Sequence, residues 1–139
     1  MDRPSRAECG AAAPAESPFK GKRGVARIVQ ALLNSLAGLK DAWRHESAFR
    51  QEIVLATILV PVAFAVPVTG PERALLVGSL LLVLVVELLN SSVEAAIDRI
   101  SLDRHSLSKR AKDLGSAAVL VTLALLTVVW ALVLLPRLA

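Results

Sequence analysis

Residues 87–98 read ELLNSSVEAAID and occupy the second half of an otherwise apolar stretch, 74–100. An acidic side chain inside a bilayer costs about 3 kcal/mol on insertion scales, so polar residues in such a stretch need a reason. The spacings of three, four and four residues place the polar members on one helical face. That face favours a site for a cation, a proton or a phosphate-bound metal over a polar seam between helices. Its members are Glu87, Asn90, Glu94 and Asp98.

The composition indicates a small integral membrane protein with one domain. The chain has 139 residues, of which 55% are hydrophobic, and its net charge is +4. A soluble domain of this length has too little interior to bury so much apolar surface. Nine basic residues precede the first apolar run and five lie within 99–112. The positive-inside rule and anionic lipid headgroups account for this distribution, whereas no nucleic-acid-binding pattern is present.

The N-terminal part of the chain divides into a tail and an amphipathic segment. Residues 1–24 contain scattered proline, glycine and charge without a helical or strand period, which predicts a disordered tail and no signal peptide. In 25–48, apolar residues recur every three or four positions between basic and amide side chains. This pattern predicts a helix that lies on a membrane surface.

Three apolar runs follow, and they predict an all-α fold with three transmembrane helices. The expected spans cover about 49–68, 74–100 and 115–135. We expect a turn at 69–73 and a polar, basic loop or short interfacial helix at 101–113. The distribution of Lys and Arg then places the N-terminus and the loop after the second span in the cytoplasm. The acidic face would therefore meet water at the cytoplasmic interface.

The residue types on this face suit phosphoryl transfer to a lipid alcohol. A carboxylate as deep as Glu87 is desolvated and binds a proton more readily, which suits a general base. Magnesium in such sites takes one or two carboxylates plus nucleotide phosphates and water, and Glu94 with Glu46 would supply the carboxylates. Lys112 and Arg27 offer positive charge for phosphate groups.

The residues alone leave other classes open. The chain has neither a phosphate-binding G-x-x-x-x-G-K-[ST] loop nor the signatures of soluble kinases. A lipid kinase, a proton- or cation-conducting membrane protein and a non-catalytic membrane interaction module all remain compatible with the pattern. An antiporter would need internal repeats, and three spans without a repeat argue against one.

The motif at 87–98 resembles the signature of the prokaryotic diacylglycerol kinase family, which has Glu, Asn, Glu and Asp at the same four positions. Three further stretches resemble the family in the same order: SLAGL at 35–39 with AW at 42–43, ESAFRQE at 46–52, and KDLGSAA at 112–118. The resemblance runs from Arg27 to the C-terminus. Three positions depart from it: Asn34 stands where the family has Tyr, Asp103 where it has Glu, and Lys109 where it has a small residue.

The resemblance implies a homotrimer in the bacterial inner membrane that transfers the γ-phosphate of ATP, with Mg²⁺, to diacylglycerol. Undecaprenol, the acceptor in another branch of the family, is the nearest alternative. By position, Glu87 would be the catalytic base, Glu46 and Glu94 would bind the metal, and Asn90 and Asp98 would support the site. The ATP-binding positions would be Arg27, Asn34, Glu46, Glu94, Asp103, His105, Lys112 and Asp113. The lipid-binding positions would be Arg27, Ser35, Ala48, Phe49, Arg50, Gln51, Glu52, Glu87 and Ser116.

Overall fold

The structure, a computed structural model, describes residues 24–100 and 105–137. The predictions for residues 1–23 and for Asp103 lie outside this part of the chain. The described residues form α1 (Val25–His45), α2 (Ser47–Ala65), α3 (Gly70–Ile100) and α4 (Ser106–Leu134), followed by the short 3₁₀ helix η1 (Leu135–Arg137). They contain no β-strand, which confirms the prediction of an all-α fold.

The chain divides into two compact units, residues 1–36 and 37–139, with the division inside α1. In the first unit, the apolar residues of α1 that recur at helical spacing, such as Ile28 and Leu32, are exposed to solvent. Gln30 donates a hydrogen bond to Asn34 one turn further along, at 3.0 Å. The exposed apolar side chains are those expected of a helix whose apolar face rests on lipid.

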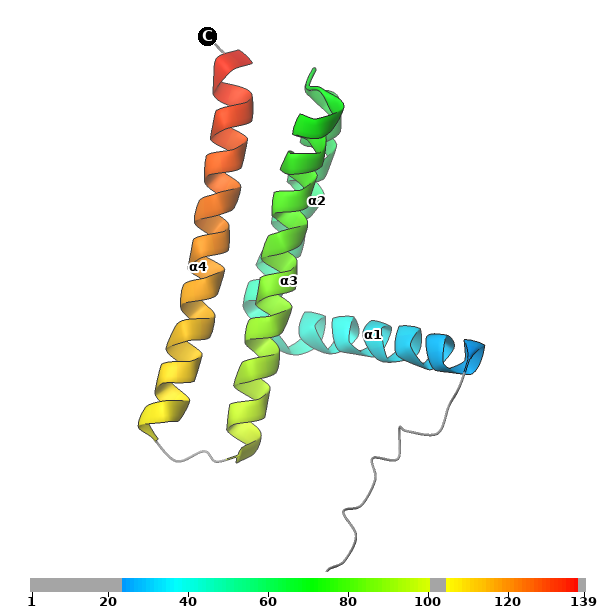
Figure 1. Cartoon of the computed structure of the whole chain (residues 1–139), viewed down its shortest axis with the longest axis vertical. Helices are drawn as coiled ribbons and strands as arrows, with labels where there is room; N and C mark the ends of the chain where they lie inside the picture. Colours follow the sequence, from blue (N-terminus) through cyan, green and yellow to red (C-terminus); the bar gives the residue numbers. More distant parts are fainter. Residues whose placement is uncertain (1–23, 101–104, 138–139) are drawn as a thin grey trace, which may run out of the picture. The chain divides into compact units, whose positions relative to one another are not determined.

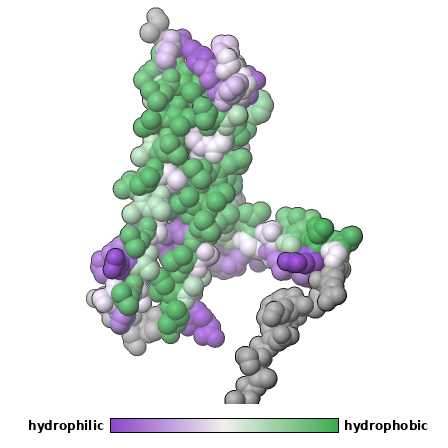
Figure 2. Space-filling model, in the orientation of Figure 1, coloured by the Kyte–Doolittle hydropathy of each residue, from purple (hydrophilic) through white to green (hydrophobic). Residues whose placement is uncertain are grey.

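Three helices are long and apolar enough to cross a membrane: Ser47–Ala65, Gly70–Ile100 and Ser106–Arg137. Hydrophobic side chains cover most of the length of α2, α3 and α4, and hydrophilic side chains gather toward the helix ends (Figure 2). Many large apolar residues on these helices remain exposed, among them Ile58, Leu81 and Leu120. These surfaces suit lipid or another protein chain. The homotrimer itself stays a prediction.

α3 packs against α4 and also against α2 (Figure 1). Two clusters of buried side chains hold the three helices together. Near the α2–α3 turn, one cluster joins all three helices and consists of Ala63 from α2, Leu76 from α3 and Val133 from α4. Further along, the cluster of Leu80, Val83 and Leu126 joins α3 to α4, with side chains of α2 packed against it.

Trp130 links the two clusters and also makes a polar contact between helices. Its half-buried indole packs against both clusters, and Nε1 donates a hydrogen bond to the backbone oxygen of Leu76 at 3.3 Å. A buried indole N–H needs such an acceptor, because the surrounding apolar side chains offer none. This bond helps to set the position of α4 along α3.

α2 ends at Ala65, three residues before the predicted end of the first span, and α3 begins at Gly70, four residues before the predicted start of the second. The connection therefore lies at 66–69 and not at the expected 69–73. The backbone N–H and the hydroxyl of Thr69 both donate to Glu72 Oε2, at 2.8 and 2.7 Å. A Thr followed three residues later by Glu is the capping-box pattern that starts helices. Pro71 fits here because the N–H groups of the first helical turn have no acceptor within the helix, so the N–H that proline lacks is not needed.

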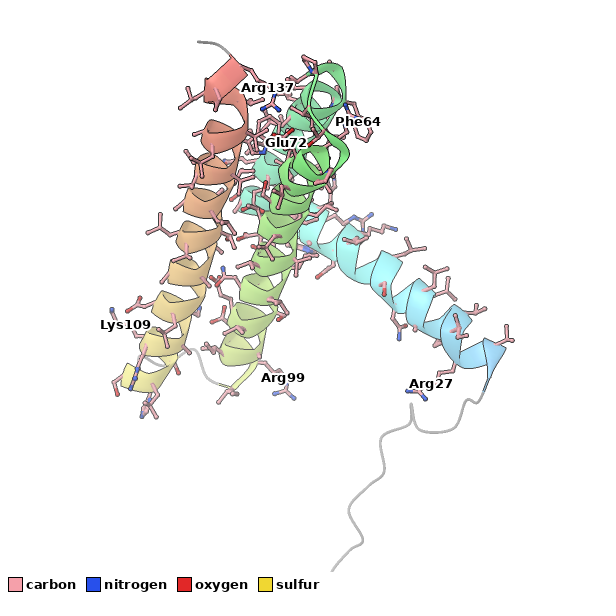
Figure 3. The ribbon with its side chains drawn as sticks, turned by 45° about the horizontal axis from the view of Figure 1, so that its top comes forward. Arg27, Phe64, Glu72, Arg99, Lys109 and Arg137 are labelled. Carbon is pink, nitrogen blue, oxygen red and sulfur yellow. The ribbon has the colours of Figure 1, made fainter. Side chains whose placement is uncertain are left out.

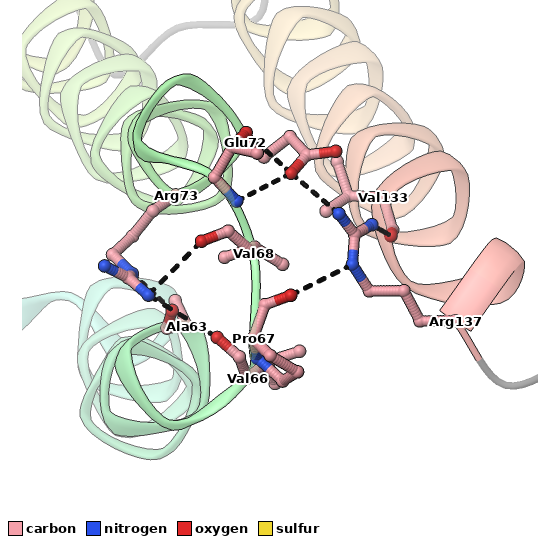
Figure 4. A network of polar contacts seen from close by, with 9 residues as sticks. Ala63, Val66, Pro67, Val68, Glu72, Arg73, Val133 and Arg137 are labelled. Atoms are coloured by element: carbon pink, nitrogen blue, oxygen red, sulfur yellow. Dashed lines mark hydrogen bonds and ion pairs between the residues drawn. The ribbon is translucent and has the colours of Figure 1, made fainter.

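Two arginines at this end of the molecule donate hydrogen bonds to the turn and to the ends of the helices around it (Figure 4). Arg73 donates to the backbone oxygens of Ala63, Val66 and Val68, which lie at the end of α2 and in the turn. Arg137, in η1, pairs with Glu72 at 2.7 Å and also donates to the backbone oxygens of Pro67 and Val133. Both arginines therefore satisfy carbonyl groups that have no partner within a helix.

At the junction of the first two helices, α1 ends at His45 and Glu46 has an extended backbone before α2 begins. Arg50 donates to the backbone oxygens of Trp43 and Arg44, at 3.1 and 3.2 Å. The guanidinium thus caps the last turn of α1, where a positive charge also suits the helix dipole. Glu46 is held in the bend between the two helices.

Candidate active site

The acidic face of α3 changes from buried to exposed along the helix. Glu87 is only 4% exposed. Asn90 and Glu94 are half-buried, and Asp98, near the end of α3, is exposed. Burial decreases toward the α3–α4 connection, as the sequence pattern predicted. Along this one face, the polar side chains therefore change from a carboxylate enclosed by helices to groups that solvent can reach.

Asn90 lies where this face of α3 meets Gly115 of α4. Its Nδ2 donates a hydrogen bond to Glu94 Oε1 at 3.1 Å. Its Oδ1 is buried and has no hydrogen-bond partner among the described residues. That oxygen lies against Gly115 of α4, so that a Cβ at position 115 would overlap it. Glycine is the residue that leaves room for the amide here.

Two ion pairs surround the open end of the face. Lys112 of α4 pairs with Asp98 of α3 at 2.6 Å, and Lys109 pairs with Asp113 one turn along α4, also at 2.6 Å. Lys109 and Arg99 mark this end of the helices, and Glu72 and Arg137 mark the opposite end (Figure 3). The predicted ATP residues Lys112 and Asp113 therefore lie at the same end as Asp98.

The start of α2 contributes a second acidic group and an open hollow. Phe49 and Glu52 are buried, with exposed fractions of 3% and 8%, and Glu52 Oε2 has no partner among the described residues. Ala48 and Gln51 are exposed. A hollow of about 340 Å³ opens beside them, lined by Ser47, Arg50, Gln51 and Val54. Two of the predicted lipid-binding residues, Arg50 and Gln51, thus line a concave surface.

Carboxylates from α3 and from the start of α2 converge. Glu46 and Glu94 both lie close enough to Glu87 for their charges to repel its charge, and Glu87 in turn repels Glu52. The sequence separates Glu46 from Glu94 by a whole helical hairpin, and the fold brings both near Glu87.

The donor set fits magnesium in the form that phosphoryl-transfer sites use. No group of three or more His, Cys, Asp or Glu residues in 24–100 and 105–137 could hold a metal ion alone. Magnesium in such sites takes only one or two carboxylates, and phosphate oxygens and water complete its octahedron. Glu46 and Glu94, both half-buried, would supply those carboxylates.

The remaining predicted site residues have different surroundings. Arg27, Asn34 and Ser35 belong to the compact unit of residues 1–36, where the hydroxyl of Ser35 donates to the backbone oxygen of Ala31. His105 caps the start of α4, and its Nδ1 accepts a hydrogen bond from the backbone N–H of Leu107 at 3.2 Å. Ser116 is exposed on α4 next to Gly115.

Two features of this region, the partner of Gly115 and the capping role of Arg50, were not predicted from the sequence. Gly115 is an isolated glycine within a helical pattern, a signal of close packing whose partner the sequence does not identify. The capping role of Arg50 depends on the bend at Glu46, which no local pattern indicates. Both features arise where two helices meet.

Comparison with known proteins shows the family of the chain. The family described as prokaryotic diacylglycerol kinase matches residues 33–134. The diacylglycerol kinase of Pseudomonas aeruginosa is 56% identical over 119 residues, which cover 86% of this chain and 97% of that protein. That of Haemophilus influenzae is 47% identical over 107 residues, covering 77% and 91%.

The diacylglycerol kinase of Escherichia coli (strain K12) is 45% identical over 111 residues, which cover 80% of this chain and 91% of that protein. The match spans all three membrane-capable helices and includes the acidic face, Glu46 and Lys112. The chain is therefore an enzyme, a lipid kinase, and it belongs to the prokaryotic diacylglycerol kinase family.

Proposed function

We propose that this lipid kinase transfers the γ-phosphate of ATP to the hydroxyl of diacylglycerol and forms phosphatidate. The observation that carries the proposal is the burial of Glu87 among other carboxylates, on a helix apolar enough to lie within the membrane. A lipid hydroxyl reaches such a position from the bilayer, whereas a nucleotide approaches from water. The names of the relatives support diacylglycerol as the acceptor.

Glu87 is the general base in this proposal. As the hydroxyl oxygen of diacylglycerol bonds to the γ-phosphorus, its proton passes to the carboxylate of Glu87. The bond from that phosphorus to the oxygen bridging to the β-phosphate breaks, and ADP leaves with the bonding electrons. Burial suits this task, because a desolvated carboxylate accepts a proton more readily at neutral pH.

The other polar groups bind and orient the two substrates. Glu46 and Glu94 would hold Mg²⁺, which would neutralise charge on the phosphates. Lys112 and Asp113 contact the nucleotide, together with Arg27, Asn34, Asp103 and His105. The hollow beside Arg50 and Gln51 receives the glycerol end of the lipid, with Ser35, Ala48, Phe49, Glu52 and Ser116 completing the lipid site.

We further propose that the enzyme works as a homotrimer in the bacterial inner membrane. The exposed apolar surfaces of α2, α3 and α4 leave room for neighbouring subunits. The N-terminus and the α3–α4 connection would face the cytoplasm, since basic residues are concentrated in both. ATP would then reach the exposed end of the acidic face directly.

The test is transfer of radiolabelled γ-phosphate from Mg·ATP to diacylglycerol in detergent micelles, with undecaprenol assayed in parallel. We expect label in phosphatidate, and a loss of at least about 100-fold in Glu87→Gln with binding of an ATP analogue retained. Glu72→Gln is the matched control, because it makes the same change on the same helix at the opposite end. It is expected to keep full turnover.

Two outcomes would contradict the proposal in different ways. Label found only in undecaprenyl phosphate would keep the chemistry and replace the acceptor. Label in neither lipid, together with ATP-independent ion flux in liposomes, would make the acidic face an ion path. Near-normal turnover by Glu87→Gln would remove that residue from the role of base.

A further inference from the structure

We propose that Gly115 is a positioning residue for Glu94 and acts through Asn90. Because position 115 carries no side chain, the Asn90 amide lies against α4, and from there it holds the Glu94 carboxylate. The inference rests on the proposed function in one respect, namely that Glu94 binds the metal. It adds a residue of α4 to a site whose carboxylates belong to α3 and to the start of α2.

The hydrogen bond between Asn90 and Glu94 defines the orientation of both side chains. An ionised carboxylate only accepts hydrogen bonds, so the amide nitrogen of Asn90 must face it. The bond from Nδ2 to Glu94 Oε1 measures 3.1 Å. With one oxygen bound to the amide, the second oxygen of Glu94 remains available to a metal ion. This is the arrangement by which outer residues orient metal ligands.

The amide oxygen of Asn90 is consequently directed at α4, where it is buried without a partner among the described residues. A buried acceptor without a donor is unfavourable, and a side chain free to rotate would leave this position. The orientation persists because Nδ2 donates to Glu94 and because Gly115 leaves the space that Oδ1 occupies. A Cβ at 115 would overlap Oδ1 and would lie 3.2 Å from Cγ and 3.9 Å from Cβ of Asn90.

The three atoms nearest to such a Cβ all belong to the side chain of Asn90. The end of an Asn side chain can rotate away, whereas backbone atoms could not. An alanine at 115 would therefore be accommodated by turning the amide, with the two helices still packed. The turn would break the bond to Glu94, so the substitution should affect metal binding more than folding.

Gly78 provides a matched control. It lies on α3, in the same helix as Asn90, and a Cβ there would have no neighbour within 4 Å. Gly78→Ala makes the same chemical change as Gly115→Ala without displacing a side chain. Any general effect of replacing a helical glycine appears in both variants.

The experiment measures Mn²⁺ binding directly, by electron paramagnetic resonance of free Mn²⁺, with a non-hydrolysable ATP analogue present. Thermal unfolding and the Mg²⁺ concentration for half-maximal phosphoryl transfer are recorded for the same samples. We expect Gly115→Ala to weaken Mn²⁺ binding about 10-fold and to raise the Mg²⁺ requirement similarly. Gly78→Ala is expected to bind Mn²⁺ as the unchanged protein does.

Asn90→Ala tests the route through the amide. It should weaken Mn²⁺ binding as much as Gly115→Ala does, and adding Gly115→Ala to it should have no further effect. If Asn90→Ala binds Mn²⁺ with an affinity within twofold of that of the unchanged protein, the inference is overturned, even if Gly115→Ala fails to fold. Equal and additive losses in the double variant would also overturn it. Absence of phosphoryl transfer in the unchanged protein would reject the proposed function and leave the Mn²⁺ test intact.

Discussion

Lys112 on α4 donates a hydrogen bond to Asp98 on α3, with 2.6 Å between Nζ and Oδ1. The two side chains are 39% and 52% exposed, so solvent screens their attraction. The pair nevertheless restrains a long, flexible lysine at the end of the acidic face. Asp98 thereby holds in place the cation that we assign to the ATP phosphates.

We expect Asp98→Asn to raise the KM for ATP severalfold and to leave the unfolding temperature nearly unchanged. The exposed pair adds little to stability, whereas a released Lys112 must be ordered again when ATP binds. Steady-state kinetics at saturating lipid measures the effect. Asp41→Asn, which removes an exposed carboxylate of α1, is the control. An unchanged KM in Asp98→Asn would show that the ion pair does not order Lys112 for ATP, and a lower KM would show that the pair competes with ATP.

Removal of the metal should stop phosphoryl transfer reversibly. We expect excess chelator to abolish label transfer and added Mg²⁺ to restore it. Glu46→Gln and Glu94→Gln should each raise the Mg²⁺ concentration for half-maximal activity by about 10-fold or more, because even outer-shell partners of a metal contribute about 10-fold. Titration with Mg²⁺ at fixed ATP measures this. Identical titrations for both variants and the unchanged protein would reject the two residues as ligands.

The ion pair at the other end of the bundle should affect stability without affecting catalysis. Glu72 and Arg137 are 31% and 28% exposed, and together they join the start of α3 to η1. We expect Glu72→Gln and Arg137→Ala each to lower the unfolding temperature in detergent by a few degrees. The double variant should be no less stable than the worse single variant. A fall in kcat in a fully folded sample would contradict this separation.

Trp130 provides a test of the packing between α3 and α4. Trp130→Phe keeps a large apolar ring in the two clusters and removes the donor to the Leu76 backbone oxygen. We expect a loss of about 0.6 kcal/mol, the typical value for a hydrogen bond between membrane helices. Denaturant unfolding in mixed micelles measures it. Trp130→Ala should cost clearly more, since it also leaves a cavity.

The sequence predicted the helices and the acidic face because both depend on local periodicity. Apolar runs of membrane length mark the spans, and spacings of three and four place Glu87 and Asp98 on one face. The earlier start of α3 was also readable, since Thr69 and Glu72 form a capping-box pattern. The role of Arg27 and the homotrimer stay predictions.

Contacts between helices could not be predicted in the same way. Sequence spacing does not identify the partner of Asp98, which the structure pairs with Lys112 on the next helix. The approach of Asn90 to Gly115 depends on how far α4 slides along α3, which no single helix determines. Charge and periodicity identify which groups lie on a face, and tertiary packing decides which of them meet.

Arg73 and Arg137 restrain one end of α3 and α4, so a change in helix tilt about that end would displace the opposite end most. α3 has 31 residues. At a rise of about 1.5 Å per residue it is about 46 Å long, so a tilt of about 5° at the fastened end displaces the far end by about 4 Å. Near the far end, the contacts between α3 and α4 in the described residues include the exposed Lys112–Asp98 pair and the approach of Asn90 to Gly115. A change in tilt would therefore displace the residues where the acidic face opens to solvent more than it displaces the loop between α2 and α3.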